Sequence, residues 1–423
     1  MNRLQQPHIN SIDDIGLWSS EHYDLDNGLK VHQIDTGTQD VVKIEFIFEA
    51  GICQQTKKLT STLTNKMLAE GTNNYTAYQI AEKLDTYGAF LSTSIDKDFS
   101  SIALYSLNKH LSKLLPVLEE IILKPSFHKH EFDLFLNKLE QEFIVNQEKV
   151  KHLAQTNFSR LMFGENTAYG QMANTNDFKI INLDDIKQFY QNKYSLSNCN
   201  VFVSGKIAPD FKNLFNKHFG TISSRQFVDN TNDFKLHSTQ KLKHKIVKEN
   251  AMQSAIRIGK PLFNLHHPDF LGLLILNTIL GGYFGSRLMA NIREDKGYTY
   301  GIGSSVFSLK HSGLFAIITE VGSNYLEASL EEIYKEIILL QKIEVSQEEL
   351  ALVKNYILGQ MIRSMDGPFS RHEKLKSTVL QGLDLSHYQK RVDVVKSIDS
   401  SQLKDLANKH LQLNSLIELI VGA

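Results

Sequence analysis

The spacing of hydrophobic residues changes along the chain between the period of a strand and the period of a helix. Two stretches near the N-terminus, 29–35 and 41–48, are rich in apolar residues, and a turn at 26–28 (Asp-Asn-Gly) precedes them, which is typical of a β-hairpin. Further along, apolar residues recur at helical spacing and glycines end several segments. The pattern predicts helices over residues 60–70, 77–87, 111–123, 129 to about 155 and 183–193, and strands over 90–94, 101–107 and 200–204.

The order of these elements occurs twice. Segment 103–139 resembles 316–357, with LEEI and IIL in both, and segment 183–207 resembles 400–423. Such self-similarity indicates a duplicated unit. We therefore expect an α+β protein made of two tandem homologous domains, each an antiparallel-rich sheet with helices packed on it. The predicted domains are residues 1–222 and 245–423, joined by a polar linker, 223–244, and facing each other like a clam around a cleft.

Composition and net charge limit the classes of protein to which this chain can belong. A chain of 423 residues with 42% hydrophobic and 22% charged residues is an ordinary globular protein with more than one core. Its net charge of -1 gives no electrostatic reason to expect nucleic acid or membrane as a partner. Cys53 and Cys199 lack metal or redox spacing, and the polar N-terminus does not resemble a signal peptide. We expect a cytoplasmic protein.

The most informative stretch is 277–307. A helix that contains Leu288 and Ile292 is expected to end at Gly297, and a strand is expected to follow. Arg293 and Tyr300 lie seven residues apart across this helix end. By residue type alone, such an Arg is more often a surface residue and such a Tyr half-buried core. The alternative is that both side chains point into one cleft.

Common catalytic motifs are absent from the sequence. No helix carries two histidines four residues apart with a glutamate beside the first, because Lys376 stands where a second histidine would follow His372 and Glu373. The pairs at 128–130 and 266–267 lack a third ligand at helical spacing and are expected to be solvated.

Residues 280–305, LGGYFGSRLMANIREDKGYTYGIGSS, resemble the second domain of the insulinase and pitrilysin family of zinc peptidases, the inverzincins. There, a glycine-rich turn and an "SRL" helix lead to an Arg and a Tyr seven apart. The likeness covers essentially the whole chain, including DNGLKV, FEAG, MLAEGT, YGAFLSTSIDKD and FGENTAYG. Active members carry H-x-x-E-H on the helix before the MLAEGT-like corner. Here Thr62 and Lys66 replace the two histidine ligands, and Asn65 replaces the glutamate base.

This departure implies that the chain holds no catalytic zinc. A lysine repels Zn²⁺, an asparagine cannot act as a base, and Glu142 or Glu148, near the third-ligand spacing, cannot hold zinc alone. Some members of the family are split into two chains, and the resemblance implies that this is the chain without metal. Arg293 and Tyr300 would then assist a homologous zinc-bearing subunit in cleaving peptides or unfolded polypeptides.

Two alternatives stay open. The chain could be an inert homologue that binds peptides or serves as a scaffold. It could also be an independent hydrolase, although no nucleophile and base are found for one.

Overall fold

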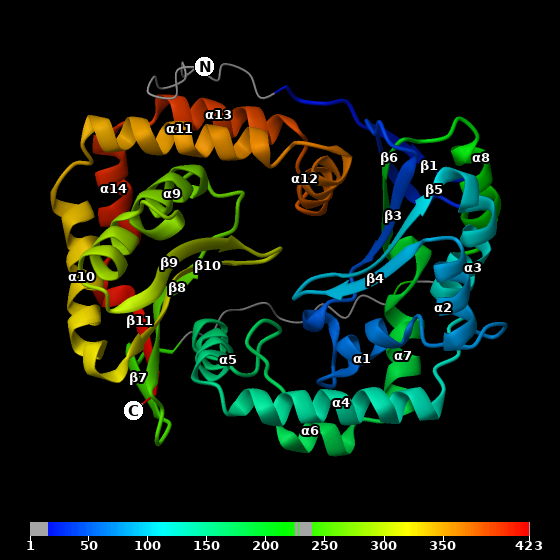
Figure 1. Ribbon diagram of the computed structural model, residues 1–423, viewed down its shortest axis with the longest axis horizontal. Coiled ribbons are helices and arrows are strands. Elements are labelled where there is room, and N and C mark those ends of the chain that lie inside the picture. Colours follow the sequence, from blue (N-terminus) through cyan, green and yellow to red (C-terminus); the bar gives the residue numbers. More distant parts are fainter. Residues whose placement is uncertain (1–15, 225–226, 228–238, 423) are drawn as a thin grey trace, which may run out of the picture.

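The computed structural model of the protein describes residues 16–224, 227 and 239–422, and two sheets organise it (Figure 1). The strands of the first sheet are β1 (Glu21–Asp24), β2 (Lys30–Asp35), β3 (Val41–Phe48), β4 (Phe90–Ile95), β5 (Ser100–Leu107) and β6 (Cys199–Gly205). The second sheet consists of β7 (Lys243–Val247), β8 (Gln253–Leu262), β9 (Thr299–Ser308), β10 (Gly313–Gly322) and β11 (Ile417–Gly422).

The helices that accompany the sheets also fall into two groups. The first group is α1 (Thr60–Met67), α2 (Ala77–Thr86), α3 (Leu111–Leu123), α4 (Lys129–Gln147), α5 (Val150–Phe163), α6 (Thr175–Ile180), α7 (Leu183–Lys193) and α8 (Phe211–Phe215). The second group is α9 (Phe270–Asn277), α10 (Leu326–Lys342), α11 (Gln347–Arg363), α12 (Pro368–Leu380), α13 (Ser386–Ser397) and α14 (Ser400–His410).

The two sheets share one topology. The strand orders are β1-β2-β6-β3-β5-β4 and β7-β11-β8-β10-β9, so they correspond strand for strand once β1 is set aside. In both sheets one corresponding pair is parallel, β2 with β6 and β7 with β11, and the others are antiparallel. The predicted α+β class with two homologous domains is confirmed.

Helix capping repeats in the same places. Before the last strand of each sheet, α7 and α14 begin with a capping box, formed by Asn182 with Asp185 and by Asp399 with Gln402. In each box the first side chain accepts a hydrogen bond from a free N–H of the helix start, and the second side chain accepts one from the backbone N–H of the first residue. The duplication therefore extends to the signals that start individual helices.

The single helix predicted over 129 to about 155 is wrong, because two helices occupy this stretch. Lys149 has extended backbone angles (φ -95, ψ 117) and separates α4 from α5. The break lets α5 leave the first half and pack on the second sheet, against β8 and β11. The contact is apolar: Ala154, Phe158 and Met162 cluster with Leu419 and neighbouring strand residues.

The second half in turn supplies a helix, α12, to the first sheet. Helix α12 lies against β6 and β2 of the first sheet, so each half supplies a helix to the other half's sheet (Figure 1). In β3, Val42, Ile44 and Phe46 belong to the apolar core of the first half. Lys43 and Glu45 alternate with them and point to the opposite face of the sheet. Both are nevertheless buried, at 3% exposure each, and both pair with residues of α12, which covers that face.

A third contact joins the halves where two hairpin turns meet. Asp98, in the β4–β5 turn, accepts hydrogen bonds from the Tyr169 hydroxyl and from the backbone N–H of Lys310 in the β9–β10 turn. The Lys310 ammonium also pairs with Glu49 at 2.6 Å. Because the two turns occupy equivalent places in the two sheets, this contact lies at the centre of the duplicated arrangement.

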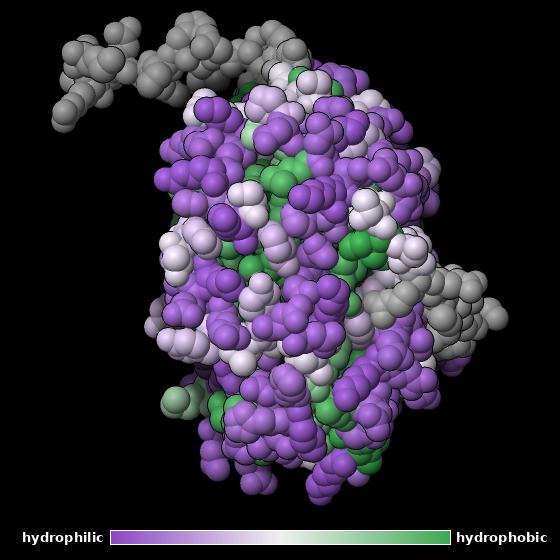
Figure 2. All heavy atoms as spheres, turned by 90° about the vertical axis from the view of Figure 1, so that its right-hand side faces the viewer, coloured by the Kyte–Doolittle hydropathy of each residue, from purple (hydrophilic) through white to green (hydrophobic). Residues whose placement is uncertain are grey.

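The predicted linker lies partly outside the described residues, which omit 225–226 and 228–238. Its last residues, Lys243 and His244, already belong to β7. The predicted domain boundaries stay predictions. Within the described ranges, no helix combines the length and the apolar character needed to cross a bilayer. The face on the side of the first half is mostly hydrophilic, with apolar side chains visible only in narrow strips (Figure 2).

Candidate functional site

Helix α1 carries the residues that correspond to the zinc motif. Thr62 and Lys66 are four residues apart, on one face of the helix, and both are half-buried. Asn65 is buried at 1% exposure, and its Nδ2 donates a hydrogen bond to the backbone oxygen of Ser101 at 3.2 Å. A hydroxyl, an ammonium and an amide already tied to a strand do not form a Zn²⁺ donor set. The residues present on α1 therefore do not fit the metal.

The two glutamates near the third-ligand spacing have different surroundings. Glu142 is exposed on α4. Glu148 follows α4 and forms an ion pair of 2.6 Å with Lys248, which lies beyond β7 in the second half. The side chain of Glu148 thus crosses between the halves.

Arg293 and Tyr300 are in direct contact, although not through their two functional groups. The Nε of Arg293 donates a hydrogen bond to the backbone oxygen of Tyr300 at 3.0 Å. The guanidinium lies over the Phe284 ring, 4.6 Å from its centroid, and one nitrogen is 3.8 Å from a Glu294 oxygen. The Tyr300 side chain is 94% exposed. The arrangement orients the guanidinium and leaves the phenol accessible.

Tyr300 lines a cleft of about 690 Å³ between the two halves. Glu148, Lys149 and neighbouring residues of the first half form one wall. Residues 248–253, between β7 and β8, form the other together with the start of β9. Thr62, Asn65, Lys66 and Arg293 are not among the described residues that line it. The structure thus brings Tyr300 and Glu148 to one cleft and leaves α1 elsewhere.

Sequence reasoning missed the residues that hold the Arg293 segment. Asn291 Nδ2 donates to Glu332 at 2.8 Å and to Glu336 at 2.7 Å, both on α10. Arg287 forms a two-pronged pair with Glu349 on α11. The sequence shows Asn291 and Arg287 only as polar residues of this segment. It does not identify their partners, which lie 41 to 62 residues further along the chain. These bonds fix the segment against the second half.

Glycine is required at position 281. A Cβ there would lie 2.5 Å from the backbone nitrogen of Ser304 in β9. This close approach packs the glycine-rich turn against β9, the strand that contains Tyr300.

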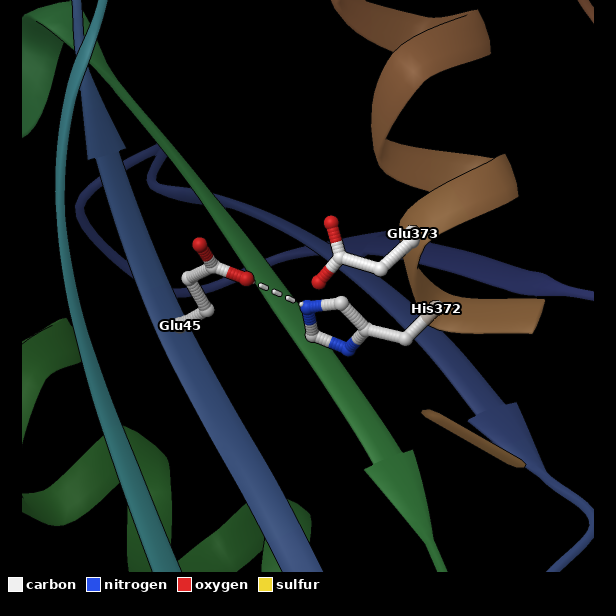
Figure 3. Close-up of side chains that lie close together, drawn as sticks. All are labelled: Glu45, His372 and Glu373. Atoms are coloured by element: carbon white, nitrogen blue, oxygen red, sulfur yellow. Dashed lines mark hydrogen bonds and ion pairs between the residues drawn. The ribbon is translucent and has the colours of Figure 1, made fainter. Parts of the chain in front are cut away.

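One cluster of potential metal ligands lies under α12 (Figure 3). Ligand atoms of Glu45, His372 and Glu373 lie within 4.8 Å of one another. Two lysines pair with the carboxylates of this cluster. Lys43 pairs with Glu45 and with Glu373, both at 2.7 Å, and Lys376 pairs with both glutamates. Since two ammonium groups already balance two carboxylates, we interpret these five residues as an inter-half ion cluster and not as a metal site.

The ion cluster holds its imidazole neutral. His372 is 1% exposed, its Nε2 donates to Glu45 at 2.7 Å, and its Nδ1 accepts from the Ser204 hydroxyl at 2.8 Å. Burial lowers the pKa of His372 more than the hydrogen bond to Glu45 raises it. Burial alone would raise the pKa of Glu45, but the hydrogen bond from His372 and the charges of Lys376 and Lys43 hold it far below its usual range.

These shifts predict a dependence of stability on pH. Below about pH 6.5 the His372 side chain binds a proton in the unfolded chain but stays neutral in the folded chain. The free energy of unfolding therefore decreases as the pH is lowered. Glu45 adds little in this window, because its lowered pKa keeps it charged in the folded state and its ordinary pKa, about 4.3, keeps it mostly charged in the unfolded chain. We expect a smaller fall between pH 7 and pH 5.5 in His372→Gln than in the wild type. Urea titrations at both pH values measure it, and equal falls would exclude His372 as a contributor.

Comparisons with known proteins agree with this architecture. Residues 30–176 match the family model described as insulinase (peptidase family M16), and residues 181–357 match the model described as peptidase M16 inactive domain. A solved structure of a peptidase M16 inactive domain from Pseudomonas fluorescens has a TM-score of 0.86 at 21% identity, covering 96% of this chain and 98% of that one. At this identity the likeness concerns the fold.

Two relatives differ in what their names say. The uncharacterized zinc protease YmxG of Bacillus subtilis is 22% identical over 387 residues, 91% of this chain and 93% of that protein. The non-peptidase homolog YmxG of Helicobacter pylori is 22% identical over 369 residues, 84% of this chain and 83% of that protein. With residues 30–176 and 181–357 matched by two models of one family, the chain belongs to the insulinase family of peptidases, family M16.

Proposed function

We propose that this chain is the metal-free subunit of a two-chain insulinase-family peptidase. The observation that carries the proposal is the pairing of an α1 that cannot hold zinc with an Arg293 and a Tyr300 in contact beside an interdomain cleft. A zinc ion and a general base would come from a homologous partner chain. The relative named as a non-peptidase homolog supports a member of the family that does not cleave peptides by itself.

The chemistry left to this chain is binding and charge stabilisation. The hydrogen bond to the Tyr300 carbonyl uses the Arg293 Nε, and one terminal nitrogen lies 3.8 Å from Glu294, so the other terminal nitrogen is the one we assign to a substrate carbonyl. Phe284 supports the guanidinium from one face. Donors fixed before the reaction stabilise a developing negative charge without the cost of reorganisation. The exposed Tyr300 phenol is a second donor, on the wall of the cleft between the two halves.

Reconstitution tests the proposal. The chain and a homologous chain with an intact H-x-x-E-H motif are mixed, their association is followed by size-exclusion chromatography, and cleavage of an unstructured peptide is measured. We expect a heterodimer that cleaves the peptide faster than either chain alone. Association without faster cleavage would contradict a catalytic contribution and would support the inert homologue.

The inert, peptide-binding or scaffolding homologue is the second candidate function. It is favoured by the contact between Arg293 and the Tyr300 main chain, which would also stabilise the transition from helix to strand. It predicts that peptide binding, measured by fluorescence anisotropy, survives without any effect on a partner's turnover.

A further inference from the structure

Two histidines face each other at the edge of the first sheet. His22 on β1 and His32 on β2 are direct cross-strand partners, and their Nδ1 atoms are 2.6 Å apart. His22 is exposed at the edge strand, and His32 is half-buried. The His32 ring stacks on Phe202, with centroids 4.9 Å apart and an interplanar angle of 20°, which fixes its orientation.

The outer nitrogens of both rings are already engaged. His32 Nε2 lies 3.2 Å from Oδ1 of Asn200, and His22 Nε2 lies 2.9 Å from the Ser20 hydroxyl. An amide oxygen only accepts, so His32 must carry its proton on Nε2, and its Nδ1 lone pair faces His22. In the metal-free protein His22 therefore donates from Nδ1, and Ser20 donates to its Nε2. The result is a directed chain of hydrogen bonds with one proton between the two rings.

We propose that His22 and His32 form a two-imidazole site for a divalent first-row transition ion such as Zn²⁺ or Cu²⁺, bound through both Nδ1 atoms. Imidazole nitrogen is a preferred ligand of these ions. On binding, the proton of His22 moves from Nδ1 to Nε2, and the Ser20 hydroxyl turns from donor to acceptor. Both imidazoles stay neutral, and no proton is released to solvent.

The geometry permits this change with a small movement. Zinc–nitrogen bonds of about 2.0–2.1 Å in a tetrahedral site place two nitrogens roughly 3.3 Å apart. The pair must therefore open from 2.6 Å, and the exposed His22 on the edge strand is the ring that can move. Asn200 and Ser20 would then hold both outer N–H groups, as partners behind metal-bound histidines commonly do.

The electrostatic setting also suits a cation. Burial is the main reason that the pKa of His32 lies below its ordinary value, so this ring is neutral and able to bind a metal at pH 7. Lys30 opposes a cation here and Asp24 favours one. Within the described ranges, the only group of at least three His, Cys, Asp or Glu ligands within reach of one another is the ion cluster under α12, so water completes the coordination. The proposal does not depend on the proposed function.

Isothermal titration with ZnCl₂ at pH 8 tests the site. We expect one saturable equivalent whose affinity falls at least about 10-fold in His22→Asn and in His32→Asn, and about 10-fold in Ser20→Ala. The matched control is His218→Asn, which removes a histidine whose Nδ1 pairs with Glu119 at 2.8 Å and should bind like the wild type. Thermal unfolding without zinc verifies that each variant is folded.

A second set of measurements tests whether the His22 proton stays on the protein when zinc binds. Titrations in two buffers of different ionisation enthalpy should give the same heat, and ¹⁵N spectra should show the His22 proton on Nε2 after zinc is added. No saturable binding, equal binding by the wild type and both histidine variants, or a proton released for each ion would overturn the proposal.

Discussion

Replacing Glu45 with alanine is expected to lower the free energy of unfolding by about 3 to 5 kcal/mol, the usual cost of removing one partner from a buried ion pair. The side chains of Lys43 and Glu45 are each 4% exposed, 2.7 Å apart, and Lys376 and His372 also bond to this carboxylate. The variant leaves buried donors and a surplus of positive charge beneath α12.

Urea denaturation measures this loss, and Glu373→Ala is the matched control. The Glu373 side chain is 51% exposed, so water can replace it, and its removal should cost about 1 kcal/mol or less. Hydrogen exchange should locate the damage. Amides of α12 should lose protection in Glu45→Ala, whereas those of α5, held by an apolar contact, should keep theirs. Equal losses of unfolding free energy in the two variants would contradict the interpretation that the buried part of the cluster holds α12 on the first sheet.

Replacing Arg293 with alanine is expected to reduce cleavage by the reconstituted pair by about 100-fold or more, the typical effect of losing one donor to a developing negative charge. Arg293→Lys should restore little, since an ammonium cannot reproduce the planar group that bonds Tyr300 and stacks on Phe284. Heterodimer formation should be unchanged, because the proposed effect concerns the reaction and not assembly.

Lys296→Ala is the matched control for Arg293. It removes a cation from the same segment, one that pairs with Glu332 at 3.5 Å and has no proposed part in catalysis. Its cleavage rate should match the wild type. If Arg293→Ala also cleaves at the wild-type rate while staying folded and paired, the residue is structural only.

Local signals were sufficient for many elements. Helix α7 has the predicted bounds, residues 183–193, because its apolar spacing and its Asn182 cap coincide. The duplication, visible as repeated segments, is present in the topology of both sheets. In these places propensity, capping and tertiary packing favour the same structure.

The exchange of helices between the halves could not be predicted in this way. Apolar periodicity shows that a segment buries one face, but not which sheet covers it. The pattern therefore predicts one helix over 129 to about 155 where the structure has α4 and α5. His372 and Glu45 are 327 residues apart, and neither motif nor spacing connects them. For the candidate site, one of the two interpretations of the sequence has the side chains of Arg293 and Tyr300 pointing into one cleft. Tyr300 lines it, whereas Arg293 contacts the Tyr300 main chain.

The most direct test of the central claim, that α1 cannot support hydrolysis, is a peptide cleavage assay of the isolated chain with added zinc. It is run on the wild type and on His32→Asn, so that zinc at the histidine pair is not mistaken for a catalytic ion. We predict no turnover above buffer in either protein. Saturable cleavage that a chelator abolishes and that scales with the concentration of this chain alone would contradict the account.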